Sequence, residues 1–171
     1  GYNRLALYNA VELKQYDEAI NYVDRLLNQS DSVEVTANDY KFAALAYAGA
    51  KNYDEAINYY SKQLEATETP EAKADVLKAL SDSYKAKGDL VNSLAKYKEY
   101  LAVNPNANAN DYAGFATIYR NMAAEQTGEE QKASVNEALN IYKDMTTKFP
   151  TSADYANFMS ARTIQMLDPD Q

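Results

Sequence analysis

The chain has 171 residues and a formal net charge of −8, from 25 acidic and 17 basic side chains. An acidic chain lacks the basic footprint that nucleic-acid binding requires, so we expect no nucleic-acid partner. His and Cys are absent, which removes the commonest general base, the thiolate nucleophile and the usual transition-metal ligands. No apolar run reaches the length of a membrane span. We therefore expect no catalysis, no cofactor, no metal and no membrane insertion.

The order of the helices is predicted from apolar periodicity together with start and stop signals. Thr69-Pro70 places a cap residue before a proline at the first helical position, and Gly88-Asp89 predicts a left-handed turn followed by a cap. We expect residues 126–132 to be an insertion between two helices. The predicted helices cover residues 2–13, 16–28, 37–50, 53–65, 71–86, 90–102, 108–124, 130–148 and 151–167.

An internal repeat runs through these helices. The heptapeptide Tyr-Asp-Glu-Ala-Ile-Asn-Tyr occurs without change at Tyr16–Tyr22 and at Tyr53–Tyr59, 37 residues apart. Weaker versions follow at 90–97 and at 138–142. A fixed period in this range is the signature of stacked supersecondary units, and we expect each unit to be two helices joined by a short turn. The predicted units cover about 2–34, 37–70, 73–106 and 109–150, followed by a lone helix at 151–167.

The aligned positions of these units resemble the tetratricopeptide repeat (TPR). Its pattern asks for small and aromatic residues in the first helix, and for Tyr, Ala and a final Pro in and after the second. The chain departs from the family late in the second helix, where Leu26, Gln63, Tyr100 and Met145 replace an Ala. The resemblance implies an all-α, right-handed superhelix of helix-turn-helix repeats (an α-α superhelix), a single array over residues 1–171. The first helix of each unit would line its concave groove. The matching positions are Tyr40, Ala43-Ala44, Tyr47, Tyr53, Ala56 and Tyr60 in the second unit, Leu77, Leu80-Ser81, Tyr84, Gly88, Ser93, Tyr97 and Pro105 in the third, and Tyr112, Phe115-Ala116, Tyr119, Ala138, Tyr142 and Pro150 in the fourth.

Basic side chains recur on the first helices despite the acidic background. Arg4, Lys41 and Lys78 are spaced 37 residues apart, and Lys85 and Arg120 form a second column further along these helices. In the groove that the resemblance implies, such a ladder would bind the backbone or the carboxylates of an extended acidic or C-terminal peptide. The alternative is that these are solvated side chains on an exposed face, which is the usual role of scattered charges.

Tyr8 is the remaining candidate binding residue. Most of the 16 Tyr occupy repeat positions that pack between helices, whereas Tyr8 and Tyr22 are expected nearer the surface. The family's two-carboxylate clamp for chaperone tails requires Lys, Asn, Asn, Lys and Arg. That clamp is absent from the sequence, so chaperone-tail binding is not expected. The corresponding positions hold Arg4, Tyr8, Phe42, Asp75 and Ala79.

Together these features predict a non-catalytic protein-interaction module that binds a peptide or helix of a partner protein in its groove. The alternative is a structural or assembly scaffold within a larger bacterial envelope repeat protein. The last predicted helix bears on this choice, because Phe158 and Ile164 belong to an apolar stripe without a partner helix. Either the natural protein continues, or the stripe pairs with a second copy in a homo-oligomer. The start at Gly1-Tyr2, without an initiator Met, indicates a fragment of a longer repeat protein. The Asn- and Tyr-rich, Cys-free composition favours a periplasmic or otherwise extracytoplasmic location over a cytoplasmic one.

Overall fold

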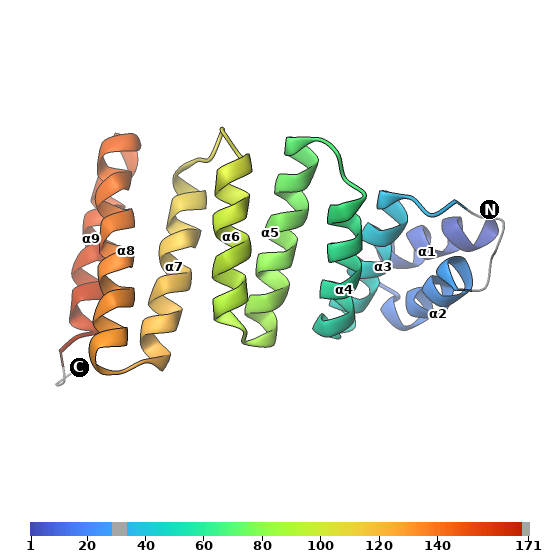
Figure 1. Ribbon diagram of the computed structural model, residues 1–171, viewed down its shortest axis with the longest axis horizontal. Coiled ribbons are helices and arrows are strands. Elements are labelled where there is room, and N and C mark those ends of the chain that lie inside the picture. Colours follow the sequence, from blue (N-terminus) through green and yellow to red (C-terminus); the bar gives the residue numbers. More distant parts are fainter. Residues whose placement is uncertain (29–33, 169–171) are drawn as a thin grey trace. The chain divides into compact units, whose positions relative to one another are not determined.

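The computed structural model describes residues 1–28 and 34–168, and all regular elements in these ranges are helices (Figure 1). The expected all-α fold is confirmed. The helices agree with the predicted ones to within a few residues at each end. By its internal contacts the chain divides into two compact units, Gly1–Asp89 and Leu90–Gln171. None of the described helices is both long and apolar enough to cross a membrane.

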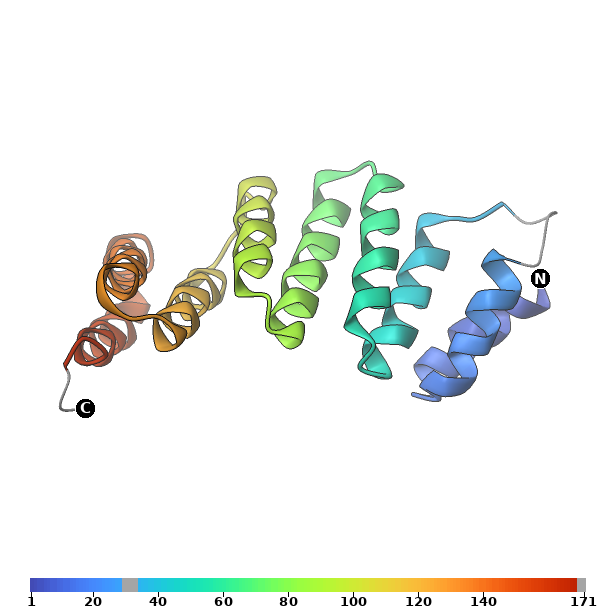
Figure 2. The same ribbon diagram turned by 60° about the horizontal axis from the view of Figure 1, so that its bottom comes forward.

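The described residues of the N-terminal unit form five helices, and each packs against the next along the chain (Figures 1 and 2). α1 also contacts α3. Leu7, Ala43, Ala56 and Leu80 are fully buried in its core, where the small alanines allow the helices to approach closely. The five helices are α1 (Tyr2–Glu12), α2 (Tyr16–Leu27), α3 (Ala37–Gly49), α4 (Tyr53–Glu65) and α5 (Pro70–Lys87).

The C-terminal unit has a core of its own. Ala116, Ala138, Tyr142, Met145 and Ala156 are buried there, between consecutive helices that pack in chain order. Its elements are α6 (Leu90–Val103), α7 (Ala109–Glu125), α8 (Gly128–Lys148), the short 3-10 helix η1 (Pro150–Ser152) and α9 (Ala153–Gln165). The boundary between the two cores falls inside the predicted third repeat, so the division into repeat units stays a prediction.

The turns that follow α1, α3 and α5 contain a left-handed residue at the same repeat position. These residues are Lys14 (φ 59°), Lys51 (φ 63°) and Gly88 (φ 92°), spaced 37 residues apart. The left-handed turn expected at Gly88 is thus confirmed. In the first two turns, however, Lys adopts a conformation in which its Cβ crowds the following carbonyl oxygen. The turn geometry therefore recurs although the residue type changes.

α3 and α7 begin with the same capping box. The sequence Ala-Asn-Asp-Tyr occurs at 37–40 and again at 109–112, 72 residues apart. In the first copy, Asp39 N–H donates to Thr36 Oγ1 (3.2 Å) and Thr36 N–H donates to the Asp39 carboxylate (3.0 Å). In the second, Asn108 and Asp111 exchange the equivalent bonds at 3.1 and 2.9 Å. Each Asp thus satisfies an otherwise unpaired backbone donor at its helix start.

The extra residues of the last unit do not form the expected connection over 126–132, because residues 128–132 belong to α8. α8 starts at Gly128 and extends over 21 residues, compared with 13 in α4. The extra residues lengthen the start of α8, where Glu129 and Glu130 complement the helix dipole. Two side-chain hydrogen bonds join the start of α8 to the end of α7. Gln131 Nε2 donates to the Ala123 carbonyl (3.0 Å), and Ser134 Oγ donates to Gln126 Oε1 (2.6 Å).

Candidate binding surface

A hollow of about 560 Å³ lies between α3, α4 and α5 in the N-terminal unit. Its apolar wall is formed by Leu45 of α3, Val76 and Ala79 of α5, and Tyr60 of α4. Tyr60 is buried, and this burial, together with the charge of Asp82, raises the pKa of its hydroxyl to about 12. The hydroxyl therefore stays protonated at neutral pH.

Helical spacing brings the polar lining residues of α3 into the hollow. Asn38 and Lys41 lie one turn apart, and Leu45 follows Lys41 by four residues, so all three share one face of the helix. On the opposite side α5 begins at Pro70, where Ala72 N–H donates to Thr69 Oγ1 (3.2 Å). The capping hydrogen bonds thus fix the residue at which each helix begins.

The charged side chains in the hollow form no ion pair with any described residue. Lys41, Glu68 and Asp75 are exposed lining residues, and within the described ranges none of them forms an ion pair. Gln63 lines the hollow as well, and its side-chain Oε1 is shielded from solvent without a hydrogen-bond partner among the described residues. A buried acceptor without a donor is unfavourable. The surface thus presents two carboxylates, one ammonium group and an unsatisfied amide.

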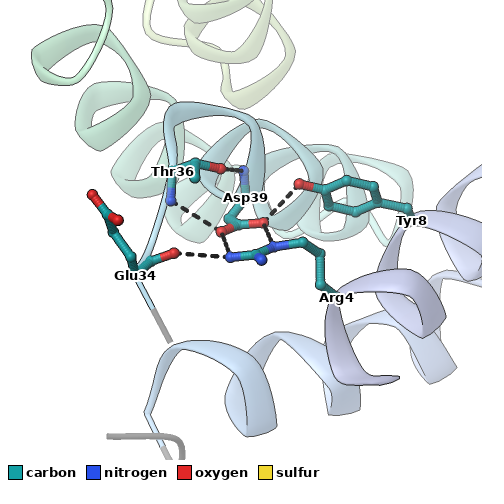
Figure 3. A network of polar contacts seen from close by, with 5 residues as sticks. All are labelled: Arg4, Tyr8, Glu34, Thr36 and Asp39. Carbon is teal, nitrogen blue, oxygen red and sulfur yellow. Dashed lines mark hydrogen bonds and ion pairs between the residues drawn. The ribbon is translucent and has the colours of Figure 1, made fainter. Parts of the chain in front are cut away.

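Beside the hollow, the buried carboxylate of Asp39 lies at the centre of a polar cluster (Figure 3). Arg4 donates to both Asp39 oxygens, from Nε at 2.8 Å and from Nη2 at 2.7 Å, and also to the Glu34 carbonyl at 2.8 Å. The Tyr8 hydroxyl donates to Asp39 Oδ1 at 2.6 Å. Asp39 is 0% exposed and the Arg4 side chain 30%. The cluster therefore fastens α1 to the start of α3.

These contacts determine the ionisation of Asp39. Burial alone would raise the pKa of its carboxyl, but the hydrogen bonds from Arg4, Tyr8 and the Thr36 backbone lower the pKa to about 2. For Tyr8, burial and the hydrogen bond to the Asp39 carboxylate raise the pKa of the hydroxyl. The cluster is therefore an ionised carboxylate held by a guanidinium and a protonated phenol across the neutral pH range.

The structure brings together only some of the binding residues predicted from the sequence. Arg4 and Tyr8 meet at Asp39, and Lys41 lies at the neighbouring hollow. Lys78 and Lys85 are exposed on α5. Burial raises the pKa of the Asp82 carboxyl, and the positive charges of these two lysines partly offset that rise.

Arg120 belongs to the C-terminal unit, and its Nε is buried without a hydrogen-bond partner among the described residues. Tyr8, expected near the surface, is half-buried, because its ring stacks on Phe42 at a centroid distance of 4.1 Å.

Sequence reasoning missed the role of Asp39 and the hollow beside it. The signal available for both was the repeated Ala-Asn-Asp-Tyr, because a second hollow of about 270 Å³ lies at the second copy. Ala109, Asn110 and Ala113 line it on α7, at positions 72 residues after Ala37, Asn38 and Lys41. Met145, Ser152 and Tyr155 complete its lining. The same backbone position thus carries a charged hollow in one unit and an uncharged one in the other.

Helices that pack in chain order, recurrent turns and small buried residues define a TPR-like helical repeat fold. Solved structures confirm this fold. A Podosopora anserina putative kinesin light chain with nearly identical TPR-like repeats is 13% identical, with a TM-score of 0.63 over 96% of this chain and 85% of that one. A variant of that kinesin light chain with a single Gln-to-Met substitution is 14% identical, with a TM-score of 0.62 over 96% and 84%.

The TPR2AB domain of yeast Sti1, solved as a complex with pHSP90, is 15% identical to this chain. Its TM-score is 0.57, over 98% of this chain and 70% of that one. No protein-family model matches the chain, and no curated protein matches its sequence. The resemblance to the TPR is therefore confirmed by the fold.

Proposed function

We propose that this chain is a non-catalytic protein-interaction module that holds a peptide or helix of a partner against the hollow between α3, α4 and α5. The observation that carries this proposal is the hollow itself. It has an apolar wall, and among the described residues three of its charged side chains lack an ion-pair partner and its Gln63 Oε1 accepts no hydrogen bond. A concave site with few convergent polar groups is the usual form of a ligand-binding site. A similar fold, in the TPR2AB domain, was solved as a complex with pHSP90, which supports a protein partner.

The predicted basic residues contribute unequally to this proposal. Lys41 faces the hollow and is available to a carboxylate of the partner. Arg4 already directs three hydrogen bonds to Asp39 and Glu34, and Tyr8 donates to Asp39. In a second form of the proposal, an acidic segment of the partner binds along the basic ladder of Arg4, Lys41 and Lys78. It predicts that Lys41→Glu combined with Lys78→Glu abolishes binding.

Site-directed photo-crosslinking tests the location of binding. We would replace Asn38, which lines the hollow, with benzoylphenylalanine, and irradiate the protein with a mixture of short degenerate peptides. As a control, the same group would replace Glu18, an exposed residue of α2 outside the hollow. We expect many times more cross-linked peptide at position 38 than at position 18. Equal yields at both positions, or none at either, would contradict the proposal.

The scaffold alternative is favoured by apolar side chains at both ends of the chain. On α1, Tyr2 is 75% and Leu5 62% exposed, and on α9, Phe158 is 58% and Ile164 55% exposed. Such surfaces mark contacts with other proteins or other copies. Sedimentation equilibrium over a range of concentrations tests self-association, with Leu5→Ser and Phe158→Ser as variants. A monomer mass at every concentration would contradict pairing through these ends. We associate this alternative with a periplasmic or other extracytoplasmic location, which fractionation of the source cells tests.

A further inference from the structure

Building on the proposed function, we propose that the hollow between α3, α4 and α5 anchors a cationic side chain, Arg or Lys, of the bound peptide. The first observation is the balance of charge at the hollow. Glu68 and Asp75 contribute two carboxylates and Lys41 one ammonium group, and none of them has an ion-pair partner in the described part of the chain. A ligand that supplies one positive charge leaves this surface neutral.

The second observation is the side-chain amide of Gln63. Its Oε1 is shielded from solvent and accepts no hydrogen bond within the described ranges. Gln63 lines the hollow, so this acceptor without a donor lies at the wall of the proposed site. An ammonium or guanidinium group supplies several N–H donors and needs acceptors only. The unsatisfied amide therefore favours a donor-rich ligand, independently of the two carboxylates.

The shape of the hollow fits the same ligand. Leu45, Val76 and Ala79 form an apolar wall, whereas the carboxylates of Glu68 and Asp75 are exposed. Arg and Lys bury an aliphatic stem along apolar surface and keep the charged end at the polar rim. Beyond the hollow, the net charge of −8 attracts positively charged partners at long range and repels acidic ones. A cationic anchor thus complements both the two carboxylates at the hollow and the negative net charge of the chain. The acidic peptide expected from the basic ladder complements neither.

Lys41 and the second hollow refine this proposal. Lys41 faces the same hollow and repels a second cation, so the proposal places a single cationic residue there, with neutral or acidic neighbours. The hollow beside Asn110 has no charged lining residue among those described and provides an internal contrast. A charge preference should therefore arise from the N-terminal unit alone.

The test uses the whole chain, immobilised, and pools of degenerate peptides that differ only in one fixed central residue, Arg, Lys, Gln or Glu. We expect the Arg and Lys pools to be retained about three- to tenfold better than the Gln pool, and the Glu pool least, as for a partly solvated charge pair. Glu68→Gln combined with Asp75→Asn should abolish this difference. The matched control, Asp17→Asn with Glu18→Gln on α2, removes the same charge from exposed residues away from the hollow. This control should preserve the preference.

Each outcome decides between the two proposals. A wild-type chain that retains the pools without favouring Arg and Lys overturns the cationic anchor and leaves peptide binding intact. A preference that persists in the Glu68 and Asp75 double variant also overturns it. If the wild-type chain retains no pool above bare resin, peptide binding itself fails. Circular dichroism confirms that each variant folds, and Asp75→Asn alone replaces the double variant if the latter unfolds.

Discussion

The carboxylate of Asp39 is buried and yet ionised, because four donors surround its two oxygens: Arg4 Nε and Nη2, the Tyr8 hydroxyl and the Thr36 backbone N–H. Removing one member of such a cluster leaves the remaining charged or polar groups without partners, which costs more than the net contribution of the bond. Asp39 should therefore be sensitive even to substitution by its amide.

We expect Asp39→Asn to lower the free energy of unfolding by about 2–3 kcal/mol, because the amide cannot neutralise Arg4 or accept from all four donors. Urea denaturation measures this change. The control is Asp17→Asn, at an exposed helix start, which should change stability by less than about 0.5 kcal/mol. Equal effects of the two substitutions would show that the Asp39 cluster does not stabilise the fold.

The pKa of Asp39 also predicts a pH dependence. In the folded chain this pKa is about 2, below the value of about 3.9 expected when the chain is unfolded. The stabilisation is thus complete above about pH 4 and is lost as the pH falls toward about 2, a change of about 2–3 kcal/mol. Urea denaturation of wild type and Asp39→Asn across this range tests it. A difference between them that stays constant with pH would contradict the assignment.

At the scale of elements, the turns after α1, α3 and α5 show backbone geometry repeated with different residues. Lys14 and Lys51 adopt the left-handed conformation that Gly88 adopts at the equivalent position. Gly reaches this region without steric cost, whereas residues with a Cβ do not. The first two turns therefore contain strain that the third lacks.

We expect Lys51→Gly to raise the free energy of unfolding by about 0.5–1 kcal/mol, since relief of the left-handed strain exceeds the added entropy of the unfolded chain. Thermal melting followed by circular dichroism measures the change. Lys143→Gly removes the same charge from an exposed position within α8, and should destabilise by about 1 kcal/mol. A loss of stability in both variants would contradict the strain argument.

The sequence predicts elements better than it predicts the site, for physical reasons. Helix positions follow from local periodicity and from caps such as Thr69-Pro70, which the structure confirms. The expected connection over residues 126–132 is wrong because a glycine near a polar stretch can also begin a helix, as Gly128 does. The grouping around Asp39 depends on a contact between residues 35 positions apart. The 37-residue spacing of the basic residues predicted that Arg4 binds a ligand. It could not reveal that the Arg4 side chain already binds the Asp39 carboxylate.

At the scale of the whole chain, the two cores are the main organising feature. The C-terminal core is assembled from residues of α7, α8 and α9, all within Leu90–Gln171. Repeat proteins derive stability from each repeat and its nearest neighbours, so a segment with a complete core can fold without the rest. The stability of each unit should thus be measurable separately.

We expect the isolated fragment 90–171 to unfold in one cooperative thermal transition, followed by circular dichroism. Its control is the same fragment with Tyr142→Ala, because Tyr142 is fully buried at the centre of the core. This substitution should cost about 3–5 kcal/mol, enough to remove the transition from a small fragment. A wild-type fragment without a cooperative transition would show that its core needs the N-terminal residues.

The Asp39 cluster has a consequence for folding kinetics. Chains with near-identical repeats, here the two copies of Tyr-Asp-Glu-Ala-Ile-Asn-Tyr, are prone to misassembly and domain swapping. Helix α1 carries Arg4 and Tyr8, whereas the equivalent positions of α3 hold Lys41 and Leu45 and those of α5 hold Lys78 and Asp82. Only α1 therefore supplies both donors to Asp39.

A buried polar contact of this kind can select one register among apolar alternatives, and we expect it to do so for α1. A variant in which Arg4→Met, Tyr8→Phe and Asp39→Leu replace the cluster by apolar groups should stay folded. After refolding, it should form more domain-swapped dimer than wild type, as measured by size-exclusion chromatography. Equal dimer fractions would show that the register of α1 is selected elsewhere. A higher dimer fraction in the variant would show that the contacts of Arg4, Tyr8 and Asp39 keep the near-identical repeats of this chain in their own positions.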